Sequence, residues 1–492
     1  MATLPHCGLK KNNFGYHILV QIFCVVCIWC VVKAGTTVKE IAFLAWPLVL
    51  MQLASIALTT TDLIMMGMLG PTEIAAGGIA ITLFGLLRTS SVGLVTPVGN
   101  LFAQTWARGG ISVKARLASQ VRLCLLLATA CGAVMAAFML LAFPFLRYLG
   151  QDPQLLSLGY SLLVFLAPSL IPLLWLQVLR NAAVALKRPG PLLLITLLAV
   201  LVNIGLNLLF VFGVGTWTGL GLPGVGLATL LTQTLMAVGF YALVRRDRLL
   251  APVLRLPTPG TVSLRSTQSR LFIRDTFRLG LPTGAAYASE AGFVSVLTLV
   301  AGTLGAASLA AHTLAFQYVN IAFMVSIGLS HAVSIHMSHA LPQRDTSRLR
   351  LLAKAIIRMG FVAMGVVAII YVTIPQTLIG LFLDENTENV GGVLRIAVPL
   401  LALAALLQFA DCQQNLAVGA MRGILKARDT FVLTMVGYWL IGVPVVLVFT
   451  YIFHMGVNGI WLGFFIGLSA TALLLWRRFY YYVHQMEHQV QR

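Results

Sequence analysis

Long apolar runs, separated by short polar connections, extend along the chain from residue 41 to residue 476. Most are as long as a transmembrane helix, which needs about 20 residues to cross a hydrocarbon core roughly 30 Å thick. Helices are expected because lipid offers no partner to unpaired backbone N–H and C=O groups. The pattern predicts twelve spans, near residues 41–69, 75–103, 118–143, 156–180, 190–213, 221–245, 280–303, 307–335, 352–382, 391–420, 431–452 and 459–476.

The composition supports a polytopic membrane protein. Of its 492 residues, 59% are hydrophobic and 10% are charged, whereas about a quarter of the residues in an ordinary soluble protein are charged. A net charge of +19 could indicate nucleic-acid binding, but the basic residues form short clusters between apolar runs. We therefore attribute the positive charge to membrane topology, and we expect membrane lipid and no nucleic acid among the partners.

The basic residues are divided unequally between the two sets of connections. In the odd-to-even connections the only Lys or Arg is Arg147, whereas the even-to-odd connections carry clusters such as Lys187 with Arg188 and the arginine-rich segment 245–278. By the positive-inside rule, the even-to-odd connections and the C-terminus are predicted to be cytoplasmic.

The apolar segment 18–32 does not fit this scheme. It follows Lys10 and Lys11, as a signal sequence would, but as a helix it would be only about 22 Å long. If it crossed the membrane, every later connection would change side and the charge bias would be reversed. We interpret residues 1–40 as an N-terminal extension that is interfacial, disordered or the result of a mis-assigned start.

The arginine-rich segment divides the spans six and six. This division predicts an N-lobe (41–245), a cytoplasmic linker (246–279), a C-lobe (280–476) and a cytoplasmic tail (477–492). The sequence "LGPTEIAA" (69–76) resembles "LGAASLAA" (304–311), and "LRNAAVALKR" (179–188) resembles "MRGILKAR" (421–428), each a basic exit from the fourth span of its half. We therefore expect an all-α protein of two pseudo-symmetric six-helix lobes, related by an axis along the membrane normal.

Three acidic residues lie inside predicted spans: Asp62, Glu290 and Asp411. An Asp at the centre of a transmembrane helix costs about 2.5–3.5 kcal/mol on insertion scales, so these carboxyls should face a protein-lined or wet cavity. Each could be a neutral carboxyl that bonds a neighbouring helix. We favour a proton or cation site, because burial favours the protonated carboxyl and a bound cation can replace the proton.

Other polar residues in the spans extend this set. Asn203 and Asn207 are four residues apart and share one helix face, so they could hydrogen-bond across helices or join Asp62 as oxygen ligands. Gln408, His312 and Arg88 could contact substrate or support the site, although packing is the simpler role for His312 and an ion pair or a wet vestibule is the simpler one for Arg88. Na⁺ would suit carboxylate and amide oxygens, at Glu290 and Asp411 or at Asp62, Asn203 and Asn207.

Three common catalytic or nucleotide-binding motifs that would indicate a different function are absent from the sequence. The sequence has no Walker A loop, no HExxH and no GxSxG. We therefore expect neither an enzyme nor an ATP-driven pump, and we expect no cofactor other than a coupling ion, Na⁺ or H⁺.

Several stretches resemble the multidrug and toxic compound extrusion transporters, in particular their NorM-like branch. "WPLVLMQLASIALTTTDLIMMGMLG" is similar to the family's first helix, "LVNIGLNLLFVFG" to its fifth, "RLGLPTGAAYASEAGF" to its seventh and "LLQFADCQQNLAVGAMRG" to its tenth. The resemblance covers about residues 41–478. It implies that Asp62, Asn203 and Asn207 form an N-lobe cation or proton site, and that Glu290 and Asp411 form a C-lobe site. Some relatives have a tyrosine where this chain has Leu407.

The function that the resemblance implies is secondary active efflux. The protein would export cationic or amphipathic small molecules in exchange for Na⁺ or H⁺, through alternating access of its two lobes. We expect a monomer in the inner membrane of a bacterium, with the C-terminus in the cytoplasm. The alternative is a flippase for lipid-linked or amphipathic intermediates, which would need a more basic cavity than these acids suggest.

Overall fold

The computed structural model describes residues 36–149, 152–247, 250–254, 267–380 and 390–491, so nearly all of the N-terminal extension lies outside it. Every regular element in these ranges is helical, and twelve helical segments are long and apolar enough to cross a bilayer, which confirms the predicted number. The first half comprises α2 (Thr36–Leu69), α3 (Pro71–Val95), α4 (Val98–Arg108), α5 (Val113–Ala142), η1 (Phe143–Leu149), α6 (Pro153–Leu166), η2 (Ala167–Ser169), α7 (Leu170–Ala185), α8 (Gly190–Asn207), η3 (Leu208–Phe212), α9 (Leu222–Val244) and α10 (Ala251–Leu254).

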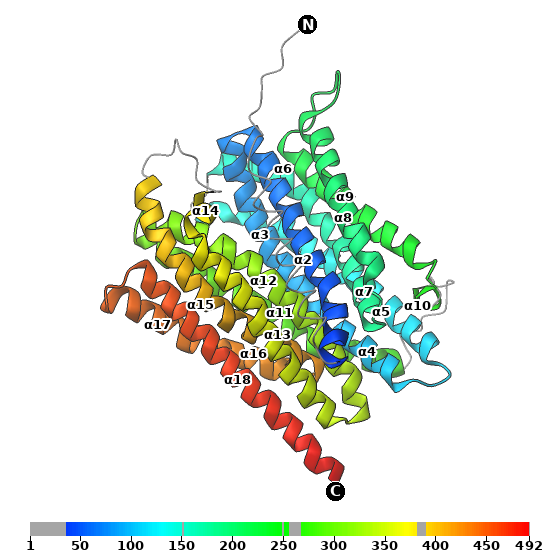
Figure 1. Ribbon diagram of the computed structural model, residues 1–492. Helices are drawn as coiled ribbons and strands as arrows, with labels where there is room; N and C mark the ends of the chain where they lie inside the picture. Colours follow the sequence, from blue (N-terminus) through cyan, green and yellow to red (C-terminus); the bar gives the residue numbers. More distant parts are fainter. Residues whose placement is uncertain (1–35, 150–151, 248–249, 255–266, 381–389, 492) are drawn as a thin grey trace.

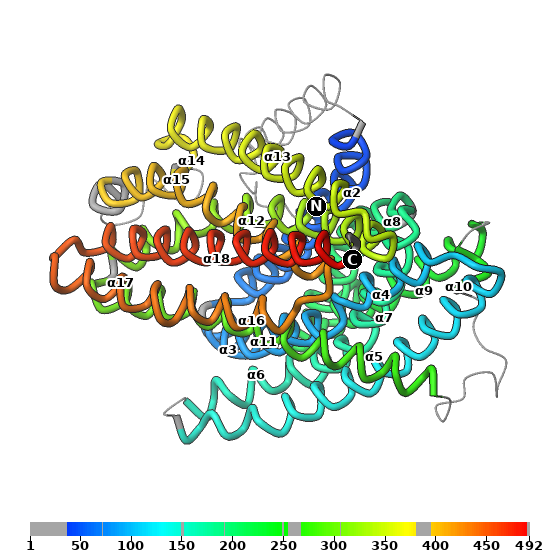
Figure 2. Tube along the Cα trace, turned by 90° about the horizontal axis from the view of Figure 1, so that it is seen from below, coloured from blue at the N-terminus to red at the C-terminus, as the bar shows by residue number. Residues whose placement is uncertain are grey.

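The second half repeats this plan. It comprises α11 (Thr267–Thr303), α12 (Ala306–Ala340), η4 (Leu341–Gln343), α13 (Thr346–Thr373), α14 (Pro375–Gly380), α15 (Val390–Gly423), α16 (Ala427–Met435), η5 (Val436–Gly442), α17 (Val443–Leu447), η6 (Val448–Ile452) and α18 (Val457–Gln491). The two halves form two helix bundles that lie side by side, and α2, α3, α11 and α12 meet between them (Figure 1). Figure 2 shows the same division from below.

Equivalent turns support the predicted duplication. Gly70 and Gly305, which precede the second span of each half, both have positive φ, at 143° and 101°. Lys187 and Leu425, which follow the fourth span of each half, have φ of 58° and 60° and close their helices with the same pattern of backbone hydrogen bonds. A positive φ is energetically costly for any residue other than glycine. Its recurrence at matching positions of the two halves therefore indicates that one structural unit is repeated.

Two predicted boundaries differ from the structure. Helix α11 begins at Thr267, so the second part of the expected linker 246–279 is helical. Helix α18 continues to Gln491 through the expected tail 477–492. Both extensions are rich in charged or aromatic residues, which made them look like connections, but the apolar positions of α18 still pack inward, with Phe479 and Val483 fully buried.

The lobes touch near the middle of four membrane spans, those of α2, of α3 with α4, of α11 and of α12, in the half of each span that lies toward the basic connections. A Cβ added to Gly93 of α3 would lie 2.6 Å from the Cα of Gly284 in α11, and one added to Gly328 of α12 would lie 2.8 Å from the Cα of Val49 in α2. These helices therefore pack backbone against backbone, which only glycine permits at these positions. We call this contact region the inner seal.

Hydrogen bonds between α4 and α12 complete the inner seal. The Asn100 Nδ2 donates to the Ser334 Oγ at 2.7 Å, to the Ser338 Oγ at 2.8 Å and to the Ser334 carbonyl oxygen at 3.2 Å. All three residues are buried. The inner seal thus combines close glycine contacts with a polar network of small side chains, and it closes the space between the lobes on the side of the basic connections.

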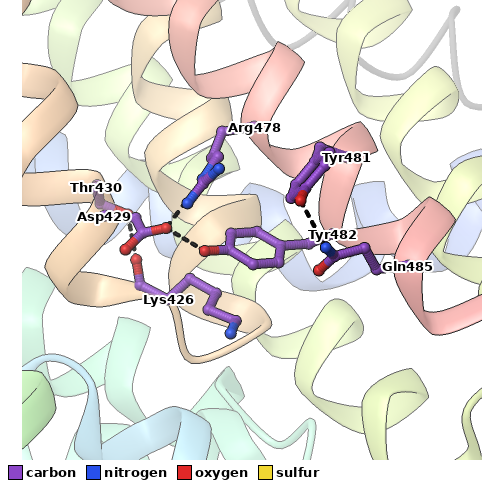
Figure 3. A network of polar contacts seen from close by, with 7 residues as sticks. All are labelled: Lys426, Asp429, Thr430, Arg478, Tyr481, Tyr482 and Gln485. Carbon is purple, nitrogen blue, oxygen red and sulfur yellow. Dashed lines mark hydrogen bonds and ion pairs between the residues drawn. The ribbon is translucent and has the colours of Figure 1, made fainter. Parts of the chain in front are cut away.

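A polar cluster fixes the extension of α18 to α16 (Figure 3). The Arg478 Nε donates to the Asp429 Oδ2 at 3.0 Å, and the hydroxyl of Tyr482 donates to the same oxygen. The ammonium of Lys426 lies 4.2 Å from the centroid of the Tyr482 ring. One carboxylate therefore organises both helices at this end of the C-lobe.

We expect Asp429→Ala to lower the stability of the protein by about 1 kcal/mol, because it removes a partly exposed ion pair and one hydrogen bond. The thermal unfolding midpoint in detergent should fall by a few degrees, while Asp275→Ala, which removes an exposed carboxylate whose salt-bridge partner is the adjacent Arg274, should leave it unchanged. A loss far larger than this would mean that the cluster is essential for folding of the C-lobe.

Candidate ion and substrate site

A cavity of about 600 Å³ lies between the lobes, on the far side of the inner seal, and all three predicted acids line it. Asp62 comes from α2, Glu290 from α11 and Asp411 from α15. Its apolar lining includes aromatic side chains such as Phe316 and Phe323. A cavity of this size, with apolar walls and a few polar groups, suits a drug-sized ligand.

The N-lobe brings Asp62 together with the predicted amides. The Asn207 Nδ2 donates to the Asp62 Oδ1 at 3.0 Å, and the Asn203 Nδ2 donates to the same oxygen at 3.3 Å. The hydroxyl of Thr229 in α9 donates to the Asp62 Oδ2 at 2.8 Å. Three helices therefore hold one carboxyl, with donors on both of its oxygens.

No described residue donates a hydrogen bond to the amide oxygens of this group. The Oδ1 atoms of Asn203 and Asn207 are buried and lack a partner among the described residues. Buried polar atoms without partners are uncommon in native proteins and often mark a site for water or an ion. With the amides rotated by half a turn, the same side chains would present oxygens toward Asp62, which is the ligand type that Na⁺ prefers.

The C-lobe site contains Glu290, Asp411 and two neighbours. The Asn415 Nδ2 donates to the Asp411 Oδ1 at 3.2 Å, while the Asp411 Oδ2 is buried without a partner among the described residues. Glu290 interacts electrostatically with Asp411 and with Tyr438 of η5. Two carboxyls that interact across one poorly solvated site repel each other when both are ionised, so a proton or cation bound there would relieve the repulsion.

Tyr438 supplies a phenol to the C-lobe site, although this chain has Leu407 at the position where some relatives have a tyrosine. Leu407, at the position where some relatives have tyrosine, is fully buried and does not line the cavity. The phenol of Tyr438 faces the cavity instead, stacked on Phe293 with ring centroids 5.2 Å apart, and accepts a hydrogen bond of 2.7 Å from the Gln414 Nε2. A tyrosine therefore belongs to the C-lobe site, although a different helix supplies it.

Arg88 is the cation that interacts with Asp62 across the cavity. It lines the cavity from α3 and interacts electrostatically with Asp62, but within the described residues the two do not come within ion-pair distance. The open space between them can admit a ligand or water. Arg88 is thus placed to balance the charge of Asp62 without occupying its oxygens.

Two other candidates lie outside the cavity lining. Gln408 is fully buried, and neither of its amide atoms has a partner among the described residues. The His312 Nε2 lies 3.4 Å from the Thr298 Oγ1, and its ring packs against Phe316 and Trp461. The structure therefore favours packing for His312 and gives Gln408 no direct access to the cavity.

Sequence reasoning missed several residues of the site. Asn415 could have been found, because it lies four residues after Asp411 on the same helix face. Thr229 carried no distinguishing signal among the hydroxyls of its helix. Arg180 and Arg422 were assigned to the basic exits of the fourth and tenth spans, yet Arg180 lines the cavity and Arg422 is only 3% exposed.

The types of donor atom at the two sites bear on which cation could bind there. Within the described ranges no group of three or more His, Cys, Asp or Glu residues could hold a metal ion. Carboxylate, amide and hydroxyl oxygens are nevertheless present at both sites, which fits Na⁺ or a proton better than a transition metal.

Comparisons with known proteins agree with this architecture. The model of the MatE family matches residues 47–209 and 282–448, one segment in each lobe. The "Probable multidrug resistance protein NorM" of Pseudomonas aeruginosa is 35% identical over 88% of this chain and 87% of its own length. The protein of the same name from Mesorhizobium japonicum is 33% identical over 88% of this chain and 92% of its own length.

Solved structures share the fold. One, described as a MATE in complex with MaD3S, superposes with a TM-score of 0.80 at 20% identity, over 92% of this chain and 98% of that one. Another, described as the outward-facing conformation of a multidrug resistance MATE family transporter, has a TM-score of 0.80 at 18% identity, over 97% of this chain and 100% of that one. By its two-lobe fold, its matched segments and its similarity to NorM proteins, the chain belongs to the MatE family of membrane transporters.

Proposed function

We propose that this protein is a multidrug efflux antiporter, which exports cationic or amphipathic small molecules in exchange for Na⁺ or H⁺. The observation that carries the proposal is the cavity between the lobes that Asp62, Glu290 and Asp411 all line. Membership of a transporter family supports transport rather than catalysis, and the names of the NorM relatives support drugs as the substrates.

Exchange follows from competition for the carboxyls. A protonated or cation-bound acid cannot also pair with a cationic substrate, so ion and substrate displace each other in the cavity. For alternating access, the two must differ in their affinity for the two arrangements of the lobes. The inner seal separates the cavity from the basic connections, which we assign to the cytoplasm of a bacterial cell, so the described state corresponds to one facing outward.

The test uses everted membrane vesicles and a rhodamine methyl ester, a fluorescent amphipathic cation. Imposing a Na⁺ gradient or a pH gradient separately should drive uptake of the dye in at least one case, and an ionophore that collapses that gradient should abolish it. If neither gradient moves the dye or other amphipathic cations, while the protein is present and folded, the antiport proposal is wrong.

The flippase alternative is favoured by one observation, the presence of Arg88 and Arg180 in the cavity. A lipid-linked phosphate would need these charges to dominate the site. Three carboxyls in the same cavity oppose that chemistry. Accelerated movement of a fluorescent lipid phosphate between leaflets of reconstituted vesicles, with no movement of the dye, would favour the flippase.

A further inference from the structure

Basic side chains gather at the end of the cavity next to the inner seal. Arg180 of α7 and His331 of α12 line the cavity itself. Arg422 of α15 lines a small adjoining pocket that shares Tyr287 with the cavity, and it donates from its Nε to Ser334 of the inner seal at 3.2 Å. His331 interacts electrostatically with both guanidinium groups. Basic groups from both lobes thus meet at one place.

Within the described residues, the two arginines of this group lack acidic partners. The Arg180 Nη2 donates to the Gln52 Oε1 at 3.0 Å. In the described part of the chain, neither Arg180 nor Arg422 has a carboxylate within ion-pair distance. Arg422 is 3% exposed, and its Nη2 has no hydrogen-bond partner among the described residues. Uncompensated charge at membrane depth is costly, and such residues usually mark a ligand path.

Tyr287 completes a set of donors. Its hydroxyl oxygen accepts a hydrogen bond of 2.9 Å from the Arg422 Nη1, so Arg422 fixes where the hydroxyl lies. No described residue accepts the proton of that hydroxyl, and Tyr287 lines both the cavity and the adjoining pocket. Arg180 interacts electrostatically with the same tyrosine. A guanidinium and a hydroxyl donor facing one space are suited to a carboxylate.

The acids of the C-lobe lie close to this basic end. Glu290 lines the adjoining pocket together with Tyr287 and Arg422. We propose that the basic end of the cavity is a subsite for the carboxylate of zwitterionic amphipathic substrates, whose cationic group is held by the acids. The inference rests on the proposed function, because it requires that the cavity bind such molecules.

The basic end would change which molecules the cavity accepts. Without the basic end, a cavity with three acids would reject anions and accept only cations. With it, a molecule that carries both charges can satisfy both ends at once. The aromatic and aliphatic walls between them provide apolar contact for the body of the molecule.

The test compares a rhodamine that carries a free carboxylate with its methyl ester, which keeps the cation and the ring system. Binding is measured by fluorescence polarisation on the purified protein in detergent. We expect Arg180→Gln to weaken binding of the carboxylate dye roughly tenfold or more, in line with the loss of a charged hydrogen bond. It should not weaken binding of the ester, because removing a positive charge does not disfavour a cation. Arg180→Lys, which keeps the charge but not the fork of donors, should restore part of the binding.

A control variant and the ester together distinguish failure of the proposed function from failure of the carboxylate subsite. Arg358→Gln, which removes an exposed arginine of α13, should alter neither dye. If the ester itself does not bind or move, the proposed function fails. The carboxylate subsite is ruled out if the ester binds but Arg180→Gln weakens binding of both dyes equally or of neither. It is also ruled out if the wild-type protein does not bind the carboxylate dye.

A lipid phosphate is the competing occupant. Binding is therefore repeated with added phosphatidylglycerol. If the lipid displaces both dyes, and Arg180→Gln removes this displacement without weakening the carboxylate dye, the basic end serves a lipid headgroup and the proposal is overturned.

Discussion

Asp62→Asn is expected to reduce gradient-driven efflux by about a hundredfold, which corresponds to a loss of about 3 kcal/mol of charge interaction. The substitution removes the charge but can keep the packing. The new amide oxygen can still accept from Asn203 and Asn207, and the new NH₂ can donate to the hydroxyl of Thr229, which accepts as well as donates. The loss would therefore report on coupling rather than on folding.

The measurement is dye transport in vesicles under separate Na⁺ and pH gradients, with protein amount and thermal unfolding midpoint as controls. Glu290→Gln serves as the matched variant, because it neutralises the C-lobe site in the same way. If Asp62→Asn leaves efflux intact and Glu290→Gln abolishes it, the coupling ion binds in the C-lobe and Asp62 has a structural role. If each variant loses dye transport under one gradient only, and the two variants lose it under different gradients, each lobe binds a different coupling ion.

Gly93→Val is expected to move the equilibrium between lobe arrangements by about tenfold to a hundredfold toward a state in which the inner seal is open. The added side chain would meet the backbone of Gly284 at 2.6 Å and the ring of Tyr287 at 3.1 Å, and the backbone cannot yield as a flexible side chain can. Overpacking of this kind typically costs about 1–3 kcal/mol, which converts to that change in population.

We would place one spin label on Ile111, in a basic connection of the N-lobe, and one on Gln343, at a basic connection of the C-lobe; both residues are exposed. Opening of the inner seal would appear as a longer distance between the two labels. Gly78→Val is the matched control, since it adds the same side chain to the same helix where no atom lies within 4 Å of the new Cβ. An unchanged distance distribution in folded Gly93→Val protein would show that these glycines do not hold the inner seal.

The sequence predicted the parts of the site that periodicity and hydropathy reveal. An acid inside an apolar run is costly wherever the helices pack, so Asp62, Glu290 and Asp411 could be recognised without a structure. Asn203 and Asn207 followed from their spacing on one helix. The division into lobes followed from the long arginine-rich segment and the paired motifs.

The remaining site residues depend on how helices meet. Arg180 and Arg422 lie at the ends of spans, where an arginine ordinarily reaches toward the headgroups, and only the packing of the lobes shows that they face inward. Tyr287 and Tyr438 looked like ordinary aromatic residues in membrane helices. Their partners are distant in sequence, so no local pattern could identify them.

The Asn100 network has a consequence for how quickly the protein can change state. If the inner seal consisted of large interlocked apolar side chains, its opening would expose apolar surface to water. That exposure would raise the free-energy barrier to opening. Here the groups that separate are an amide and two hydroxyls, and water can take over each hydrogen bond as it breaks. If the lobes alternate as proposed, the inner seal would be tight when closed and could still open quickly, and binding of ion and substrate would limit the turnover rate rather than opening of the inner seal.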